Sequence, residues 1–410
     1  MITINNLSAR LKKNDKALCM LSLILVFAGS ADTMMSFSYR HIMYYSMIFN
    51  SALLVTCLML KKRKIEWKLF KIVVVLLILV FVSMFVNADW HGYSQILVLI
   101  IAFLFVENVD YFVFWKLYDG FILVISIFSL AVIVMYMLFP TMFIFIANYL
   151  LIVIGNGDNA LSFVNLGVTV VPLFSMQMGV RNYGLFREPA MFCIYVGLAL
   201  GYNLYSSKIS SSKSLIKILI YLVTILTTWS VTGFVAVAFL MTFYLLFYFR
   251  VMDTKEKLFW ISVLLIALLL ALKFEVFGYL YSRIQLHGPS EESVLSRVYS
   301  VIGGVLVAII NPFFGIGATN SWQEFDRICN LLIGRTVMWA NHVTYYMASY
   351  GCIYILIFLG GVYKALKKIT DNRIAIVMLV FVLLLLCGEV MTYSSLMFIL
   401  MLYGYKSCYD

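Results

Sequence analysis

The hydrophobic pattern of this sequence consists of long apolar runs separated by short polar segments. A run of about 20 mainly apolar residues is long enough to cross the hydrocarbon core of a bilayer as a helix. A windowed reading of hydropathy predicts about twelve such spans. Their approximate limits are 17–32, 42–60, 70–87, 93–108, 117–139, 189–206, 214–230, 232–250, 258–275, 341–363, 374–389 and 393–406. The pattern predicts an all-α polytopic membrane protein in which residues 1–410 form a single integral membrane domain.

Two of the segments between spans are much longer than the others, residues 140–188 and residues 276–340. Long loops within a compact fold are usually functional or disordered. These two contain aromatic and apolar residues, so we expect them to be ordered. The first includes an apolar stretch, residues 143–155, that is too short to cross a membrane comfortably. We expect this stretch to form a re-entrant or interfacial helix.

The composition agrees with this class of protein. Hydrophobic residues make up 64% of the chain and charged residues 12%, and the mean hydropathy is +1.00. A soluble domain is usually nearer half apolar and a quarter charged. The seven cysteines are scattered without a CxxC pair or a His/Cys cluster, which predicts neither a metal site nor a disulfide framework. No small-residue cleavage pattern closes the first apolar run, so we expect a retained span rather than a signal peptide.

The basic residues predict the orientation of the spans, because cytoplasmic loops carry an excess of Lys and Arg. If both termini are cytoplasmic, all but eight of the 30 Lys and Arg residues fall on the cytoplasmic side. The net charge of +11 then reflects inner loops that contact anionic lipid heads. The K-K-R-K run at residues 61–64 is an ordinary flank of a span. We therefore expect no nucleic-acid partner.

The eight basic residues of the outer side are unusual in type, since seven of them are arginine. Arginine presents a planar fork that binds phosphate with two hydrogen bonds, which lysine does not. This bias suggests an anionic ligand that arrives from the outer side, although some of these arginines could simply anchor loops. They are Arg40, Arg181, Arg187, Lys273, Arg283, Arg297, Arg327 and Arg335.

The most informative segment is R-N-Y-G-L-F-R-E-P-A, residues 181–190, at the start of a predicted span. Pro189 suits the first turn of a helix, which places Glu188 at the helix start. Arg187 beside the positive end of a helix is unfavourable unless an anion joins it, and such a helix end binds phosphate or carboxylate readily. The alternative is that Arg187 and Glu188 pair with each other and only cap the span.

Three further segments carry candidate residues. Arg297 precedes an apolar stretch that ends in N-P-F-F-G-I-G, which predicts an amphipathic or re-entrant helix followed by a tight loop. His342 follows Asn341 at a predicted span start, where a neutral imidazole could act as a general base or be only a hydrogen-bonded structural residue. The W-S-V-T-G sequence at 229–233 predicts a tight turn that lets helices approach closely.

The order of these segments is more specific than any one of them. R-x-x-G-x-F-x-E-P at a span start is followed by Ser-x-Thr-Gly, then by Ser-Arg before N-P-x-x-G-x-G, then by Asn-His. Over residues 181–361 this series resembles the O-antigen polymerase and O-antigen ligase superfamily of bacterial envelope enzymes. The resemblance implies a GT-C-like glycosyltransferase of the bacterial inner membrane, with two large periplasmic loops and no cofactor or metal.

The resemblance also implies roles for individual residues. Arg181, Arg187 and Arg297 would bind the pyrophosphate of undecaprenyl-pyrophosphate-linked oligosaccharides, and Glu188 or His342 would take the proton of the acceptor hydroxyl. The family often places Asn after this His, whereas here Asn341 precedes it. Besides the lipid bilayer, a chain-length regulator and a flippase are the expected partners.

Three alternatives follow from the same pattern. The G-L-F-R-E-P form favours a polymerase, which joins lipid-linked repeat units in O-antigen biosynthesis, over a ligase, which transfers the finished glycan to the lipid A core. Twelve spans also suit a transporter such as a lipid-linked oligosaccharide flippase, but a transporter should carry ionisable groups deep within its spans. A purely structural membrane protein would leave the arginine bias unexplained.

Overall fold

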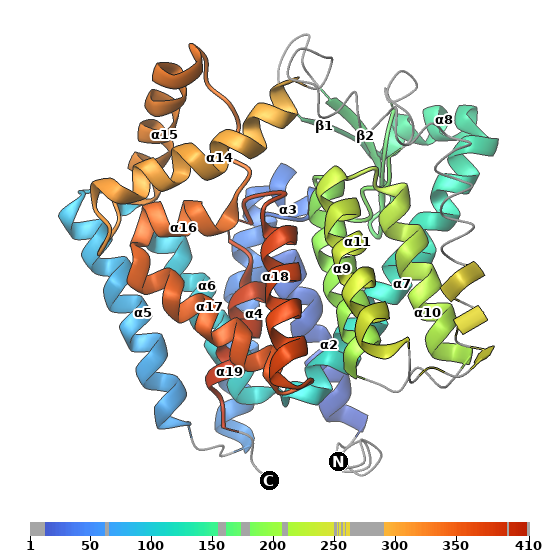
Figure 1. Ribbon diagram of the computed structural model, residues 1–410, viewed down its shortest axis with the longest axis horizontal. Helices are drawn as coiled ribbons and strands as arrows, with labels where there is room; N and C mark the ends of the chain where they lie inside the picture. The colour runs from blue at the N-terminus through green and yellow to red at the C-terminus, as the bar shows by residue number, and fades with distance from the viewer. Residues whose placement is uncertain are drawn as a thin grey trace.

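The protein is predominantly helical, with one small β-sheet (Figure 1). The computed structural model describes residues 13–61, 65–154, 161–173, 181–206, 212–249, 291–391 and 393–407, together with single residues between 252 and 262. The helices before the first large loop are α2 (Lys13–Ala28), α3 (Met34–Ser38), α4 (Arg40–Lys61), α5 (Trp67–Val86), η1 (Trp90–Gly92), α6 (Tyr93–Asn108) and α7 (Tyr111–Leu138). The later helices are α8 (Pro140–Leu150), α9 (Pro189–Ser206), α10 (Ser212–Thr227), α11 (Val231–Tyr248), α14 (Glu291–Ile310), α15 (Ala318–Ile333), α16 (His342–Tyr350), α17 (Cys352–Lys367), α18 (Asn372–Leu386) and α19 (Ser395–Tyr405).

The helices have the length and composition of a membrane protein. Five helical stretches in the described part of the chain are long and apolar enough to cross a bilayer: Arg40–Leu60, Trp67–Val86, Trp90–Asn108, Tyr111–Leu138 and Val231–Tyr248. Several other apolar helices are shorter, between 10 and 17 residues. On α5, large apolar side chains such as Ile78, Phe81 and Phe85 point away from the protein interior. Exposed apolar side chains on a long helix suit contact with lipid rather than water.

Some predicted spans differ from the observed helices. The predicted span 341–363 is broken at Gly351, which has φ +89° and separates α16 from α17. A side chain at this glycine would collide with the backbone of Phe313, so only glycine allows the break. The first predicted span ends at Ala28, and the predicted span 374–389 ends at Leu386. Most of the predicted span 258–275 lies outside the described residues.

The first large loop contains a small antiparallel sheet of three strands in the order β1 (Leu151–Ile154), β2 (Leu161–Asn165) and β3 (Val170–Pro172). We expected one helix over residues 143–155. That prediction is wrong after Leu150, because α8 ends at Leu150 and the chain continues as strand β1 from Leu151. Leu151 pairs with Val164 and Phe163 pairs with Pro172. Short strands can form here because Phe163 and Val170 are buried together against Met34.

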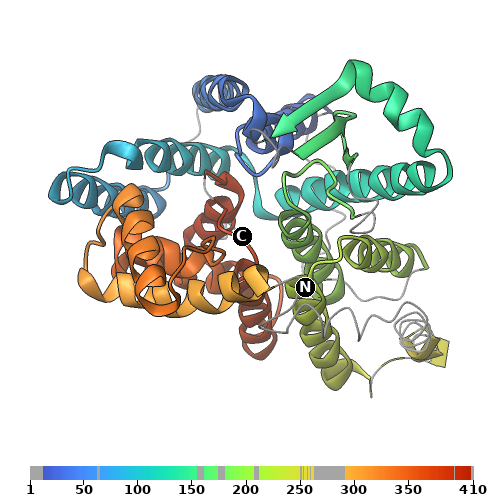
Figure 2. The same cartoon turned by 90° about the horizontal axis from the view of Figure 1, so that it is seen from above.

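Helix α19 lies in the middle of the helical bundle. All its residues from Ser395 to Tyr403 are buried, and it packs most closely on α17. Gly361 and Gly404 allow this approach, since a Cβ atom on either one would collide with the other helix. Viewed from above, α18 and α19 (red) lie between α5 and α6 (light blue) on one side and α9 and α11 (green) on the other (Figure 2).

The loops gather at two opposite ends of the bundle. At one end, Glu66 before α5 accepts hydrogen bonds from Ser407 after α19, and Lys368 after α17 donates to Tyr403. At the other end lie α14, α15 and the sheet, which belong to the two large loops (Figure 1). The start of α9, the turn between α10 and α11, and the loop between α18 and α19 also lie at this end. We call it the loop end.

Candidate functional site

The segment before α9 is held against the loop that follows α2. The backbone N–H of Arg187 donates to Asp32 O over 2.9 Å, and Met34 N–H donates to Leu185 O over 3.0 Å. Gly184 has φ +53°, and a Cβ atom there would lie 2.8 Å from the ring of Phe192. The glycine of this motif is therefore required by the turn that brings Arg187 to Asp32.

The turn between α10 and α11 lies between two arginines of the predicted site. Arg181 donates from Nε to Thr228 O over 3.1 Å and from Nη2 to Trp229 O over 3.4 Å. Arg297, on α14, donates from Nε to Thr232 Oγ1 over 3.1 Å. Ser230 caps α11 by accepting the N–H of Gly233. The predicted turn thus links the segment before α9 to α14.

Glu389, which the sequence analysis did not select, lies in the loop between α18 and α19. Its pKa is raised to about 8, mainly by burial and then by the negative charge of Glu188. Arg187 and Arg297 act in the opposite direction, while Asp32 adds a smaller upward contribution. These five residues, Asp32, Arg187, Glu188, Arg297 and Glu389, form one group of interacting charges that we call the charge cluster.

Asp32 is the most deeply buried member of the charge cluster. Its Oδ2 accepts a hydrogen bond from Tyr195 on α9 over 2.5 Å, and the Tyr195 hydroxyl lies 3.0 Å from Ser394 Oγ. Burial raises the pKa of Asp32, whereas the Tyr195 hydrogen bond and the charge of Arg187 lower it. Asp32 thereby connects the segment before α9 to the start of α19.

Arg187 and Glu188 keep part of their surface accessible. The Arg187 guanidinium lies 5.0 Å from the centre of the Phe37 ring, and its Nε has no hydrogen-bond partner among the described residues. Burial raises the pKa of Glu188, and the positive charges of Arg187 and Arg181 oppose that shift. No ion pair within 4.0 Å joins Arg187 to Glu188 in the described part of the chain. A guanidinium that forms no ion pair with the described residues is suited to bind an anion.

His342 is fully buried beside the charge cluster. Its Nδ1 accepts the N–H of Met391 over 3.2 Å, and Asn341 donates from Nδ2 to Cys387 Sγ over 3.3 Å. Because Nδ1 is an acceptor, the ring proton of the neutral imidazole is on Nε2. His342 and Asn341 therefore hold both sides of the loop that carries Glu389, and a role of His342 as a base stays a prediction.

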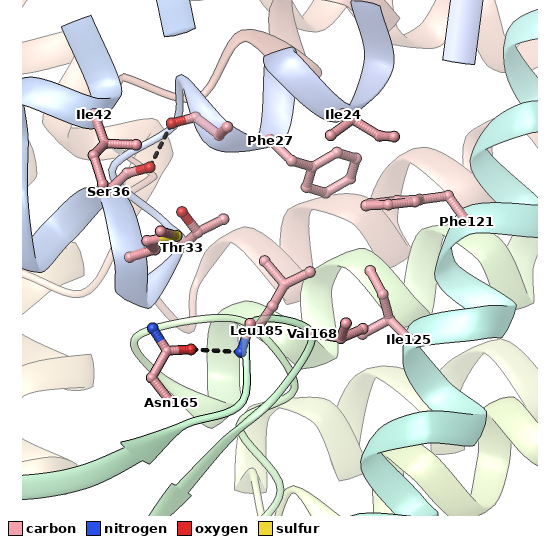
Figure 3. A pocket seen from close by; sticks show the side chains of 13 residues that line it. Ile24, Phe27, Thr33, Ser36, Ile42, Phe121, Ile125, Asn165, Val168 and Leu185 are labelled. Atoms are coloured by element: carbon pink, nitrogen blue, oxygen red, sulfur yellow. Dashed lines mark hydrogen bonds between the residues drawn. The ribbon is translucent and has the colours of Figure 1, made fainter. Parts of the chain in front are cut away.

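An apolar cavity of about 270 Å³ lies next to the charge cluster, between α2, α7 and the turn that follows β2 (Figure 3). Phe27, Phe121 and Ile125 line one side of it, and Val168 and Leu185 line another. Its other lining residues are Ile24, Ala28, Thr33, Met35, Ser36, Ile42, Asn165 and Gly167. Thr33 directly follows Asp32 in sequence and Leu185 lies two residues before Arg187, so the cavity wall and the charge cluster share these two segments.

Sequence reasoning selected Arg181, Arg187, Glu188, Arg297 and His342, and the structure brings all five to the loop end. It missed Asp32 and Glu389, although each is the sole charged residue within a long apolar stretch, 17–39 and 374–405. Ionisable residues in such stretches are costly and usually functional, so this signal could have identified both. The expected limit of 389 for the eleventh span hid Glu389 within a helix.

Within the described residues no group of three or more His, Cys, Asp or Glu side chains is arranged to hold a metal ion. Comparisons with known proteins add no further assignment. No protein-family model matches the sequence, and neither the curated proteins nor the solved structures compared with the chain gave a match.

Proposed function

We propose that this protein is a glycosyltransferase of the O-antigen polymerase type, which joins undecaprenyl-pyrophosphate-linked oligosaccharide repeat units at the periplasmic face of the bacterial inner membrane. The observation that carries the proposal is the charge cluster. Arg187 and Arg297 come from segments far apart in the sequence, yet both act on Glu389 at one end of a helical membrane protein. This arrangement supports binding of a phosphorylated lipid beside groups that can accept a proton.

The chemistry needs little beyond positioning and charge. The acceptor hydroxyl attacks the anomeric carbon of the donor sugar, and the bond between that carbon and the pyrophosphate oxygen breaks. The electron pair of this bond goes to the pyrophosphate, whose growing negative charge Arg187 and Arg297 would stabilise. Fixed donors aimed at developing charge commonly provide the largest part of a rate enhancement. A carboxylate of the charge cluster would receive the hydroxyl proton.

The surroundings of the charge cluster suit a lipid-linked substrate. The apolar cavity next to Leu185 offers a place for part of an isoprenoid chain while its pyrophosphate lies at Arg187 (Figure 3). Basic residues such as Lys364, Lys367 and Lys368 gather at the opposite end of the bundle. By the positive-inside rule that opposite end would face the cytoplasm, which would leave the loop end in the periplasm.

The role proposed for Arg181 differs from the roles of Arg187 and Arg297. Arg181 donates two N–H groups to the turn at Thr228 and Trp229, so part of its fork is already used within the protein. It still contributes positive charge near Glu188. We retain it as a contributor to pyrophosphate binding, secondary to Arg187 and Arg297.

A transporter is the second candidate, because one ionisable pair does lie within the helices. Asp119 of α7 and Lys217 of α10 are 2.6 Å apart. Asp119 also accepts hydrogen bonds from Asn203 and from the hydroxyl of Tyr221. Asp119 therefore has partners on both α9 and α10. A buried carboxylate whose hydrogen bonds and ion pair are all formed within the protein is better suited to hold α7, α9 and α10 together than to release a cargo. The polymerase remains the better-supported function.

Deletion of the gene tests the proposed function through the lipopolysaccharide pattern on a gel. A polymerase mutant carries one repeat unit on the core, a ligase mutant carries none, and a flippase mutant accumulates the lipid-linked unit at the inner face of the membrane. We expect the first of these patterns. Either of the other two, or an unchanged ladder of chain lengths, would contradict the proposal.

Complementation of the deletion strain with Arg187→Lys tests the pyrophosphate site. Lysine keeps the charge but not the planar fork, so we expect polymer yield to fall by roughly tenfold to 100-fold. Arg327→Lys is a matched control, since Arg327 is exposed on α15 and pairs with Glu324 there. We expect the control to restore normal chains. Normal chain lengths with Arg187→Lys would exclude a bidentate role for Arg187.

A further inference from the structure

The loop that carries Glu389 is held by hydrogen bonds at three points around that residue. On one side, Cys387 accepts a hydrogen bond from Asn341. On the other side, Met391 donates to His342, and Ser394 lies within 3.0 Å of the Tyr195 hydroxyl. These contacts hold the loop on both sides of Glu389, which limits the positions open to its side chain, as preorganisation of an active site requires.

Charges of both signs act on Glu389 from three other segments of the chain. Glu188 and Arg187 approach from the start of α9, Arg297 approaches from α14, and Asp32 approaches from the loop after α2. Two carboxyl groups that share a site do not both ionise easily, so one of them keeps a proton. Burial raises the pKa of Glu188 as well, but Arg187 and Arg181 both place positive charge near Glu188 and oppose that shift, whereas Glu389 is opposed by Arg187 and Arg297.

We propose that Glu389 is the residue that takes the proton of the acceptor hydroxyl, and that Glu188 is its ionised partner in a carboxyl pair. This inference rests on the proposed function. As the O–H bond of the acceptor breaks, its proton passes to a Glu389 carboxylate oxygen. The hydroxyl oxygen uses the freed electron pair to bond to the anomeric carbon, and the pyrophosphate leaves with the electron pair of the broken bond. Glu389 then returns the proton to water.

The alternatives within the site are less suited to this step. His342 has no exposed surface and uses Nδ1 to accept the Met391 N–H. As whole residues, Glu389 and Glu188 are only half-buried. A pKa of about 8 for Glu389 lies near the operating pH, where a general base is most effective. Glu188 and Glu389 titrate as a pair, so the rate should report their joint ionisation.

The test uses purified protein in liposomes and, as donor and acceptor, lipid-linked repeat units extracted from the deletion strain. Glu389→Gln should lower the single-turnover rate by about 100-fold or more while leaving the apparent affinity for the lipid-linked unit nearly unchanged. Glu389→Asp should retain part of the activity.

The wild-type rate should rise with pH up to about 8, and Glu389→Gln should lose that rise. Asp326→Asn, which alters an acid on α15 outside the charge cluster, is the control.

Infrared spectroscopy gives a readout that does not depend on activity. The wild-type protein should show a protonated carboxyl band at neutral pH that disappears as the pH rises through about 8. Glu389→Gln should lack this band, and Asp326→Asn should keep it. Comparison by size-exclusion chromatography separates a misfolded variant from an inactive one, and Glu389→Asp provides a second, gentler substitution.

The outcomes separate the two proposals. If Glu389→Gln is folded and polymerises within a few-fold of the wild-type rate with the same pH dependence, Glu389 is not the base. If its rate falls only because the affinity for the lipid-linked unit falls, Glu389 serves in binding and the inference is equally wrong. If deletion of the gene leaves the lipopolysaccharide ladder intact, the proposed function fails and the catalytic role of Glu389 fails with it.

Discussion

Burial of the Glu389 carboxyl group has a consequence for stability as well as for chemistry. Its ordinary pKa is 4.5, and in the folded protein it is raised to about 8. The folded state therefore binds this proton more tightly than the unfolded chain does. The stabilisation from the protonated form is complete below about pH 4.5 and is lost as the pH rises through about 8.

The stability of the wild-type protein in detergent should therefore decrease between about pH 5 and about pH 8, by an amount on the order of a few kcal/mol. Glu389→Gln cannot ionise, so its thermal midpoint should fall less over the same range. Glu188 and Asp32 also have raised pKa values, so part of the dependence should remain. Thermal unfolding at a series of pH values measures this, and identical pH dependence in both proteins would show that Glu389 does not titrate as expected.

At the residue scale, the sequence alone pointed to Arg187, Glu188 and Arg297 as candidates. Their selection depended on charge at a span boundary, which is a local property. Asp32 and Glu389 are equally conspicuous as isolated charges in apolar stretches, but neither belongs to a motif. Their connection to Arg187 depends on a backbone hydrogen bond and on a loop position that no local pattern encodes.

At the scale of elements, α9 and α11 hold the charge cluster together because they approach each other closely. Gly233 on α11 lies against Cys193 on α9, and a Cβ atom at position 233 would collide with the Cys193 sulfur. The start of α9 carries Arg187 and Glu188, and α11 begins at the turn that contacts Arg181 and Arg297. A change in the distance between these two helices should therefore alter the site.

Gly233→Ala should lower the free energy of unfolding by roughly 1–3 kcal/mol, because it overpacks this contact. Cys193→Ala removes the sulfur that the new methyl group would meet. The double variant should then be more stable than the sum of the two single effects, with a coupling of roughly 0.5–3 kcal/mol. Thermal unfolding of the three variants in detergent checks this, and strict additivity would show that the two residues do not limit helix approach.

Hydropathy predicted the start of a helix such as α9 correctly, but it did not predict the break between α16 and α17. The predicted start of the sixth span coincides with the first residue of α9, where Pro189 begins the helix. The break at Gly351 was missed because the sequence around it is as apolar as the helices themselves. Its cause is a tertiary contact with Phe313, more than thirty residues earlier in the chain.

At the scale of the whole molecule, the fold separates two chemically different ends. The end near Glu66, Lys368 and Ser407 carries basic residues and short connections. The loop end carries the charge cluster, the small sheet and the long helices α14 and α15 (Figure 1). Under the proposed function, the lipid-linked substrate would reach the charge cluster from the loop end or from the adjacent lipid.

Labelling of single added cysteines measures which end faces which compartment. Gln323 on α15 and Lys367 at the end of α17 are both exposed. A membrane-impermeant maleimide should label Gln323→Cys in cells whose outer membrane alone is permeabilised, and it should label Lys367→Cys only after the inner membrane is opened. The parent chain gives the background, because its described cysteines are buried or partly buried. The reverse pattern would place the charge cluster in the cytoplasm and contradict the proposed function.

The sequence by itself determined that this chain is a helical membrane protein, because hydropathy is a sum over neighbouring residues and needs no tertiary information. It also determined which arginines and which glutamate stand out at the span boundaries. Only the tertiary structure decided that Asp32 and Glu389 join them, and that His342 braces a loop through Nδ1. Those facts depend on contacts between segments remote in sequence, which arise only when the helices pack and bring their loops to the same end.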